Sequence, residues 1–150
     1  MTSLALHVQV PSNVLLVIGA ALSTAAALLH FACIFIGAPA FRALGAGEKL
    51  ARMAERGHWY PGVVAFAIGA ALVVCATYAL SAAGVLPHLP FVRTVLSLFA
   101  AALLLRALAF PLLRPVFPEN SMKFWLVSSA GCLGMGLVHA VGLSQVWSSQ

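Results

Sequence analysis

The chain has 150 residues, of which 63% are hydrophobic and only 7% are charged, and its net charge is +5. Soluble proteins carry about 25% charged residues, and a water-soluble fold cannot bury this much apolar surface. The composition therefore excludes a soluble domain and predicts an all-α polytopic membrane protein. Nucleic-acid binding is excluded as well, because no soluble domain remains to present a basic surface, and the positive charge is expected to face anionic lipid.

Four apolar stretches account for most of the chain. A helix that crosses the hydrocarbon core of a membrane, about 30 Å thick, needs about 20 apolar residues, and each stretch has that length. We therefore expect residues 1–150 to form one integral membrane domain, an antiparallel four-transmembrane-helix bundle. The predicted spans cover residues 12–36, 60–86, 91–113 and 122–147.

Basic residues set the expected orientation, because Lys and Arg in short loops stay on the cytoplasmic side. Residues 37–59 and 114–123 hold nearly all of them, whereas the opposite side has only Arg93. We expect loops 37–59 and 114–121 in the cytoplasm and both termini outside, which is the periplasm if the membrane is a bacterial inner membrane. The expected surfaces also carry an aromatic belt that marks depth, formed by Trp59, Tyr60, Trp125 and Trp147.

Local signals predict the helix ends in chain order. Ser12 is the expected N-cap of the first span. Residues 47–57 predict a short amphipathic cytoplasmic helix bounded by glycines, with Leu50, Met53 and Ala54 on one face. A solvated connector with no membrane-facing side is the alternative for this segment.

Prolines mark the remaining boundaries. Pro61 fits the first turn of the second span. Pro87 and Pro90 bracket an outer turn that is too short for anything but an antiparallel pair, so the second and third spans are expected to form a hairpin. Asn120 is the expected N-cap of the fourth span.

Small residues predict where helices pack, since they let backbones approach closely in lipid. Gly19, Ser23 and Ala27 recur every four residues on the first span. These small-residue faces are expected to join helices of this chain, a second copy in a homo-oligomer, or a partner membrane protein. The corresponding glycines of the fourth span are Gly131, Gly134, Gly136 and Gly142.

Arg106 is the residue that indicates a function most directly. An arginine inside a membrane span costs at least about 2.5 kcal/mol and normally faces protein or water with a partner. We expect an anionic or polar-headed ligand at this guanidinium. The alternative is satisfaction by serine hydroxyls, water and a backbone carbonyl freed by Pro111. A carboxylate is not expected at that depth, because the chain has no Asp and its glutamates all belong to loops: Glu48, Glu55 and Glu119.

Other polar residues are expected to line the same interior. His30 is placed at the depth of Arg106, and His139 lies nearer the outer edge, where we expect a hydrogen bond with Tyr78. For each histidine alone, a simple interhelical hydrogen bond is the alternative. The candidate ligand-binding residues are Arg106, His30, Ser128, Ser129, His139 and Tyr78.

The sequence predicts no cofactor and no metal site. The single cysteines of three spans form no CxxC pair and are interpreted as packing residues. A haem held by His30 and His139 is disfavoured, because helical rise separates the two by about 15 Å along the membrane normal. No activated nucleophile is recognisable, so whether the chain is an enzyme stays open. The cysteines are Cys33, Cys75 and Cys132.

The leading functional hypothesis is a small inner-membrane protein that binds or passes a small anionic or polar-headed amphiphile, such as a lipid or quinone, in a pocket around Arg106. One alternative is an accessory or assembly subunit that packs on partner helices through its glycine faces, without ligand chemistry. A second is a membrane-embedded enzyme acting on a lipophilic substrate, with His30, His139 and Tyr78 as acid–base candidates. Membrane lipids are expected partners in every case.

Overall fold

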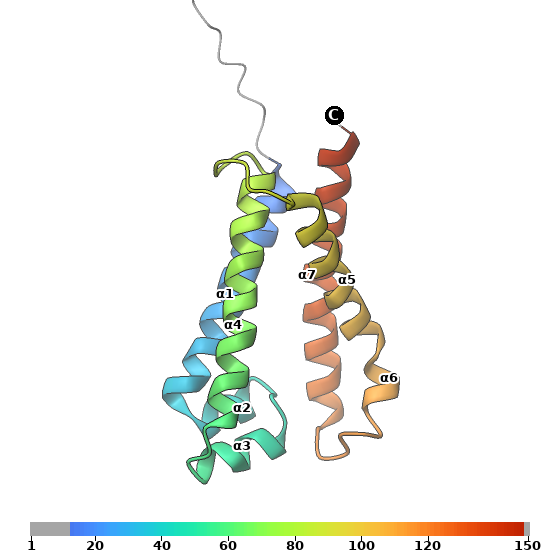
Figure 1. Cartoon of the computed structure of the whole chain (residues 1–150). Helices are drawn as coiled ribbons and strands as arrows, with labels where there is room; N and C mark the ends of the chain where they lie inside the picture. The colour runs from blue at the N-terminus through green and yellow to red at the C-terminus, as the bar shows by residue number, and fades with distance from the viewer. Residues whose placement is uncertain (1–12, 149–150) are drawn as a thin grey trace, which may run out of the picture.

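The computed structural model describes residues 13–148, which are helical throughout apart from the connections. No β-strand occurs in this part of the chain, so the all-α prediction is confirmed. Figure 1 shows the arrangement of the helices. They are α1 (Val14–Ile36), α2 (Ala38–Ala43), α3 (Glu48–Glu55), α4 (Tyr60–Ala82), α5 (Val92–Leu108), α6 (Phe110–Leu113) and α7 (Met122–Ser148).

Three of these helices are long and apolar enough to cross a membrane, namely α1, α4 and α7 over Met122–Trp147. This finding indicates an integral membrane protein, as the composition predicts. The predicted third span is divided instead. Its first part, α5, has 17 residues, or about 25 Å at helical rise. It ends at Leu108 because Pro111, in the first turn of α6, cannot continue a preceding helix.

The helices form two pairs, one of α1 with α4 and one of α5 with α7. In Figure 1 the pairs approach each other at the end that holds the α4–α5 turn and diverge toward the end that holds α2, α3 and α6. Contacts between α1 and α7 and between α4 and α5 join them. The short connection after α4 does return the chain as a hairpin, but each of its arms packs mainly against another helix.

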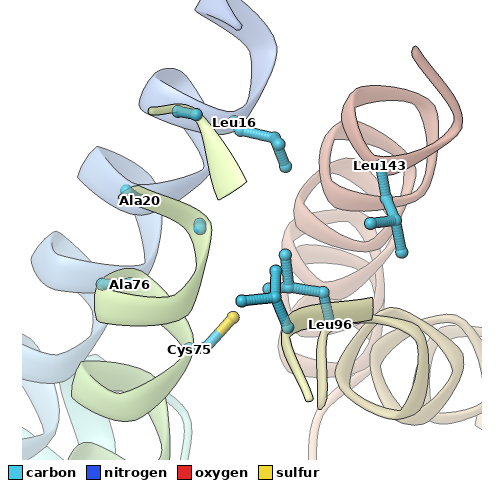
Figure 2. Packing of buried hydrophobic residues seen from close by; sticks show 9 residues of the cluster. Leu16, Ala20, Cys75, Ala76, Leu96 and Leu143 are labelled. Carbon is cyan, nitrogen blue, oxygen red and sulfur yellow. The ribbon is translucent and has the colours of Figure 1, made fainter. Parts of the chain in front are cut away.

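The larger cluster of buried apolar residues lies where the two pairs meet. Leu16 of α1, Cys75 of α4, Leu96 of α5 and Leu143 of α7 all belong to it, and Figure 2 shows them pointing into the space between the pairs. Several members are alanines, which allow close approach of helix backbones. A second cluster, which contains Phe41, joins α2 and α3 to α1 and α4 at the opposite end.

The N-cap of α1 differs from the expected one. Ser12 lies outside the described residues, and Asn13 is the capping residue, whose Oδ1 accepts a hydrogen bond from Leu16 N at 3.0 Å. The same side chain donates from Nδ2 to the carbonyl oxygen of Gly142 at 3.0 Å. One side chain therefore satisfies a free backbone N–H group of the first turn of α1 and links α1 to α7.

At the start of α7 the prediction of Asn120 is wrong by one position. Ser121 Oγ accepts a hydrogen bond from Phe124 N at 3.1 Å, which is the capping contact that the first turn requires. Both residues are good capping types, and the path of the loop decides which one flanks the helix. Pro61 occupies the first turn of α4 as expected.

The helix predicted over residues 47–57 is present as α3, between Glu48 and Glu55. Its fully buried residue is Ala51, which packs in the second cluster with Phe41. The predicted apolar residues beside it are half-buried. α3 therefore lies against the protein, and its contact with a membrane surface stays a prediction.

An ion-pair network surrounds α3. Arg42 pairs with Glu48 at 3.0 Å and with Glu55 at 2.6 Å, and its guanidinium lowers the pKa of both carboxyl groups. Arg52 pairs with Glu48 at 3.5 Å and with Glu119 at 3.3 Å, so it links α3 to the segment before α7. The three carboxylates of the chain are all engaged in this network.

Ser81 holds the turn that joins the two helix pairs. Its hydroxyl donates to Pro87 O and accepts from Leu89 N, both at 2.9 Å, and the residue is buried. Ser81→Ala is expected to lower the free energy of unfolding by about 1–2 kcal/mol, because the Pro87 carbonyl and the Leu89 N–H lose the hydroxyl that bonds them. Unfolding in detergent by SDS titration measures the change.

The matched control for this prediction is Thr77→Ala. Thr77 Oγ1 donates only to the carbonyl of Val73 on its own helix, so its loss leaves the turn untouched. We expect the Thr77 variant to unfold like the parent protein. Equal stability of the Ser81 variant and the parent would show that water replaces the lost hydrogen bonds.

Candidate functional site

Arg106 lies in the last turn of α5 and faces α7. Its Nη2 donates to Ser128 Oγ at 3.1 Å, and its Cζ lies 5.2 Å from the centroid of the Trp125 ring, within the range of a cation–π interaction. α5 ends two residues later, so Arg106 lies at a helix end and not within a helix that continues to residue 113. The C-terminal end of a helix carries partial negative charge and favours a cation.

Three buried side-chain atoms, on Arg106, on Trp125 and on the residue after Ser128, lack hydrogen-bond partners within residues 13–148. They are Arg106 Nη1, Trp125 Nε1 and Ser129 Oγ. A buried N–H group without an acceptor costs about 1–3 kcal/mol, and more when it is charged. Arg106 Nη1 and Trp125 Nε1 are N–H donors, and neither finds an acceptor among the described residues.

None of the three acidic side chains of the chain supplies an acceptor here. Their carboxylates, on Glu48, Glu55 and Glu119, pair instead with Arg42 of α2 and Arg52 of α3. The expectation that no carboxylate meets Arg106 is therefore confirmed for the described residues. Within residues 13–148, Arg106 contacts a hydroxyl and an aromatic ring and no acidic side chain.

Trp125 is the site residue that the sequence interpretation missed. An aromatic belt would place it at the membrane surface, but the ring is 2% exposed. It packs against Phe110 at 6.1 Å and Phe124 at 5.1 Å between ring centroids, beneath Arg106. Its position in the sequence could have indicated this burial. Trp125 precedes Ser128 by three residues, so both lie on one face of α7.

A second polar contact lies around His139, which is fully buried. Its Nε2 is 3.4 Å from both Ser23 Oγ and Cys75 Sγ, and its Nδ1 is 2.8 Å from Met135 O. The expected hydrogen bond with Tyr78 is wrong, because both ring nitrogens contact other groups. Tyr78 packs at the edge of the larger core cluster.

The small-residue face of α1 makes room for this imidazole. A Cβ added at Gly19 would meet the His139 ring at 3.0 to 3.3 Å, and Ser23 one turn later contacts Nε2. The face predicted from Gly19, Ser23 and Ala27 is buried along its length. It therefore holds a polar side chain as well as apolar ones.

His30 does not join Arg106. Its Nδ1 lies 2.7 Å from the carbonyl oxygen of Ala26 on its own helix, whereas Arg106 bonds to Ser128 on α7. The two residues belong to different helix pairs, since α1 packs against α4 and α5 against α7. Helical rise predicts depth along the membrane normal but not lateral position, which is why the sequence groups them.

An open apolar groove of about 360 Å³ lies between α4 and α5. Its lining residues on α5 include Ala102 and Leu103, which precede Arg106 by four and three residues, so the groove and the guanidinium occupy consecutive turns of one helix. The groove has almost no polar lining. The complete set is Ala67, Ile68, Ala71, Leu72, Phe99, Ala102 and Leu103.

Comparison with known proteins gives no further lead to the chemistry. No protein-family model, curated protein or solved structure matches this chain. What the site can do follows from its own residues. Around Arg106 it offers a fixed positive charge, unpaired N–H donors and an apolar groove one turn away. Around His139 it offers an imidazole against a thiol and a hydroxyl.

Proposed function

We propose that this chain is a small integral membrane protein that binds an anionic or polar-headed amphiphile, with the head group at Arg106 and the apolar part in the groove between α4 and α5. The observation that carries the proposal is the pair of buried N–H donors, Arg106 Nη1 and Trp125 Nε1, that lack an acceptor. A phosphate, carboxylate or quinone carbonyl supplies acceptor oxygens of the required kind.

The location of the site supports an amphiphile over a small hydrophilic anion. The groove beside Arg106 is lined by alanine, leucine, isoleucine and phenylalanine side chains, which suit an acyl or isoprenoid chain. Arg106 itself adds a single charge-assisted contact, and Ser128 already holds its other terminal nitrogen. A ligand with one polar end and one apolar end fits a site that has a single charged contact beside an apolar groove.

We further propose that the chain crosses a bacterial inner membrane four times. α5 is about 25 Å long at helical rise, and α6 after it extends the third crossing up to Leu113. The basic loops with Arg42 and Arg52 lie at the end of the molecule that holds α2, α3 and α6. The positive-inside rule places that end in the cytoplasm, so Arg106 serves the cytoplasmic half of the membrane.

Native mass spectrometry of the gently solubilised protein tests the proposal with phosphatidylglycerol and ubiquinone as separate probes. The parent protein is expected to retain one molecule of at least one probe. Arg106→Gln is expected to weaken retention about tenfold to 100-fold, because loss of a charge-assisted hydrogen bond costs about 1.5–3 kcal/mol. The preferred probe distinguishes an anionic head from a carbonyl head.

Arg93→Gln is a matched control for this experiment. Arg93 also belongs to α5, and its Cζ stands 5.2 Å from the centroid of a tryptophan ring on α7, that of Trp147. It lies at the other end of α5, far along the helix from the groove residues next to Arg106. We expect unchanged retention in the Arg93 variant. Equal retention by the Arg106 variant and the parent would refute the proposed function.

A further inference from the structure

An open hollow of about 440 Å³ lies between α6 and the start of α7. Figure 1 shows α6 at the end of the molecule that also holds α2 and α3. The hollow shares no lining residue with the apolar groove between α4 and α5, and its volume is within the range of small-ligand pockets. Its lining residues are Pro111, Arg114, Pro115, Pro118, Asn120 and Met122.

Three prolines give the hollow rigid walls. Each fixes its own backbone φ angle and has no N–H group, so the prolines offer a ligand no hydrogen-bond donor. Turn hydrogen bonds order the same segment, since Arg114 N donates to Phe110 O and Phe117 N donates to Leu113 O, both at 3.1 Å. A hollow that is already formed loses little conformational entropy when a ligand binds.

The guanidinium of Arg114 gives the hollow a positive charge, and the side chain of Asn120 adds an amide. Within residues 13–148 no carboxylate pairs with Arg114. Glu119 belongs to the adjacent loop, but its Oε2 lies 3.3 Å from Arg52 Nη2, and the residue does not line the hollow. Among the described residues, no acidic side chain therefore balances the charge of Arg114.

Large apolar side chains surround this charge on the protein surface. Leu112 and Val116, each two residues from Arg114, are 78% and 66% exposed, and Leu108 at the end of α5 is 71% exposed. Exposed apolar side chains in such a group indicate contact with lipid or with a partner. A cation among them is expected where the acyl chains of a bilayer meet the lipid phosphates.

We propose that this hollow binds a phosphate group of an anionic phospholipid. Arg114 donates charge-assisted hydrogen bonds to the phosphate oxygens, the amide of Asn120 is a second donor, and Leu112 and Val116 contact the acyl chains. Basic pockets beside transmembrane helices bind head groups of this kind. On the orientation proposed above, the lipid belongs to the cytoplasmic leaflet. The site uses neither Arg106 nor the groove beside it.

Native mass spectrometry of the full-length protein in detergent tests the site, with tetraoleoyl cardiolipin as the probe. Its two phosphates match two cations, Arg114 and Lys123, which is exposed and follows Met122 of the lining. We expect the parent protein to retain one cardiolipin. Arg114→Gln should weaken retention about tenfold to 100-fold. Lys123→Gln should weaken it about fivefold, the contribution of one cation near a membrane surface.

Arg56→Gln is the matched control, because Arg56 is also an exposed arginine, at the end of α3, and does not line the hollow. This variant and Arg106→Gln should retain cardiolipin like the parent. Dioleoyl phosphatidylcholine, whose phosphate is balanced by choline, should not be retained, and excess inorganic phosphate should not displace cardiolipin. Size-exclusion profiles confirm that each variant is folded.

Three results would overturn the proposal. The first is equal retention of cardiolipin by the folded Arg114 variant and the parent, which includes the case in which only Arg106→Gln loses it and the lipid belongs to the other site. The second is equal retention of phosphatidylcholine and cardiolipin by the parent. The third is displacement of cardiolipin by inorganic phosphate, which would identify a site for a free anion.

Discussion

Trp125→Ala is expected to lower the free energy of unfolding by at least about 3 kcal/mol, the range in which buried Trp→Ala substitutions begin. The ring is 2% exposed, packs against the rings of Phe110, Phe117 and Phe124, and covers the guanidinium of Arg106. Its removal opens a cavity and leaves Arg106 with Ser128 alone. SDS or thermal unfolding in detergent measures the loss.

Trp147→Ala is the control for this prediction. Trp147 also lies beneath an arginine, with Arg93 Cζ at 5.2 Å from its centroid, but it is 55% exposed. An exposed cation–π contact is worth about 0.5–1 kcal/mol, so this variant should lose no more than that. Equal losses from both substitutions would mean that the burial of Trp125 does not contribute to stability.

Trp125→Phe separates stability from ligand binding. It keeps an aromatic ring in the packing position but removes Nε1, a buried donor with no partner in the described chain. Without a ligand the variant should be nearly as stable as the parent, because removing an unpaired donor offsets part of the lost packing. Retention of the amphiphile should still fall, because one of its two donors is missing. Unchanged retention would assign the head group to Arg106 alone.

The membrane character of the chain and the existence of its long helices are predictable from sequence, because apolar runs longer than about 18 residues have few other structures available. The division of residues 91–113 into α5 and α6 is harder to predict from the sequence. Pro111 signals a local disturbance, but its position near the end of an apolar run is compatible with either a kinked helix or a break. The structure has the break, which moves Arg106 from mid-helix to a helix end.

The absence of an acidic side chain at Arg106 is also predictable, since the sequence places all three Glu residues outside the apolar stretches. Its contact with Ser128 follows from expecting hydroxyls on the last span. The burial of Trp125 does not follow. A tryptophan at the edge of a span fits a lipid-facing belt as well as an interior site, and only the lateral arrangement of helices distinguishes the two.

The lateral arrangement of the helices also explains why His139 contacts Ser23 and Cys75 and not the expected Tyr78. Periodicity assigns each residue to a face of its own helix, but nothing local says which helix stands opposite. Ser23, Cys75 and His139 come from three helices and share no sequence motif. Tyr78 lies three residues after Cys75, so the prediction selected the right region of α4 and the wrong side chain.

Gly142→Leu is expected to separate α1 from α7 and to destabilise the chain strongly. A Cβ at this position would stand 2.8 Å from Leu16 Cγ and 3.2 Å from the Leu16 backbone nitrogen, and Leu16 is fully buried in the larger cluster. A backbone atom moves only with its helix, so relief requires α1 to shift. Even Gly142→Ala should cost about 1–3 kcal/mol through overpacking, measured as unfolding in detergent.

Gly134→Ala is the matched substitution on the same helix. An added Cβ there meets nothing within 4 Å, so only the helix propensity changes, and Ala favours a helix over Gly by up to about 1 kcal/mol. We expect this variant to be as stable as the parent or more stable. Sequence spacing predicts that both glycines pack against another helix. In the structure only Gly142 does so, because Leu16 lies opposite it, whereas nothing lies opposite Gly134. If Gly134→Ala destabilises the protein as much as Gly142→Ala, the open face of α7 is covered in the membrane by another chain, as the accessory-subunit hypothesis predicts.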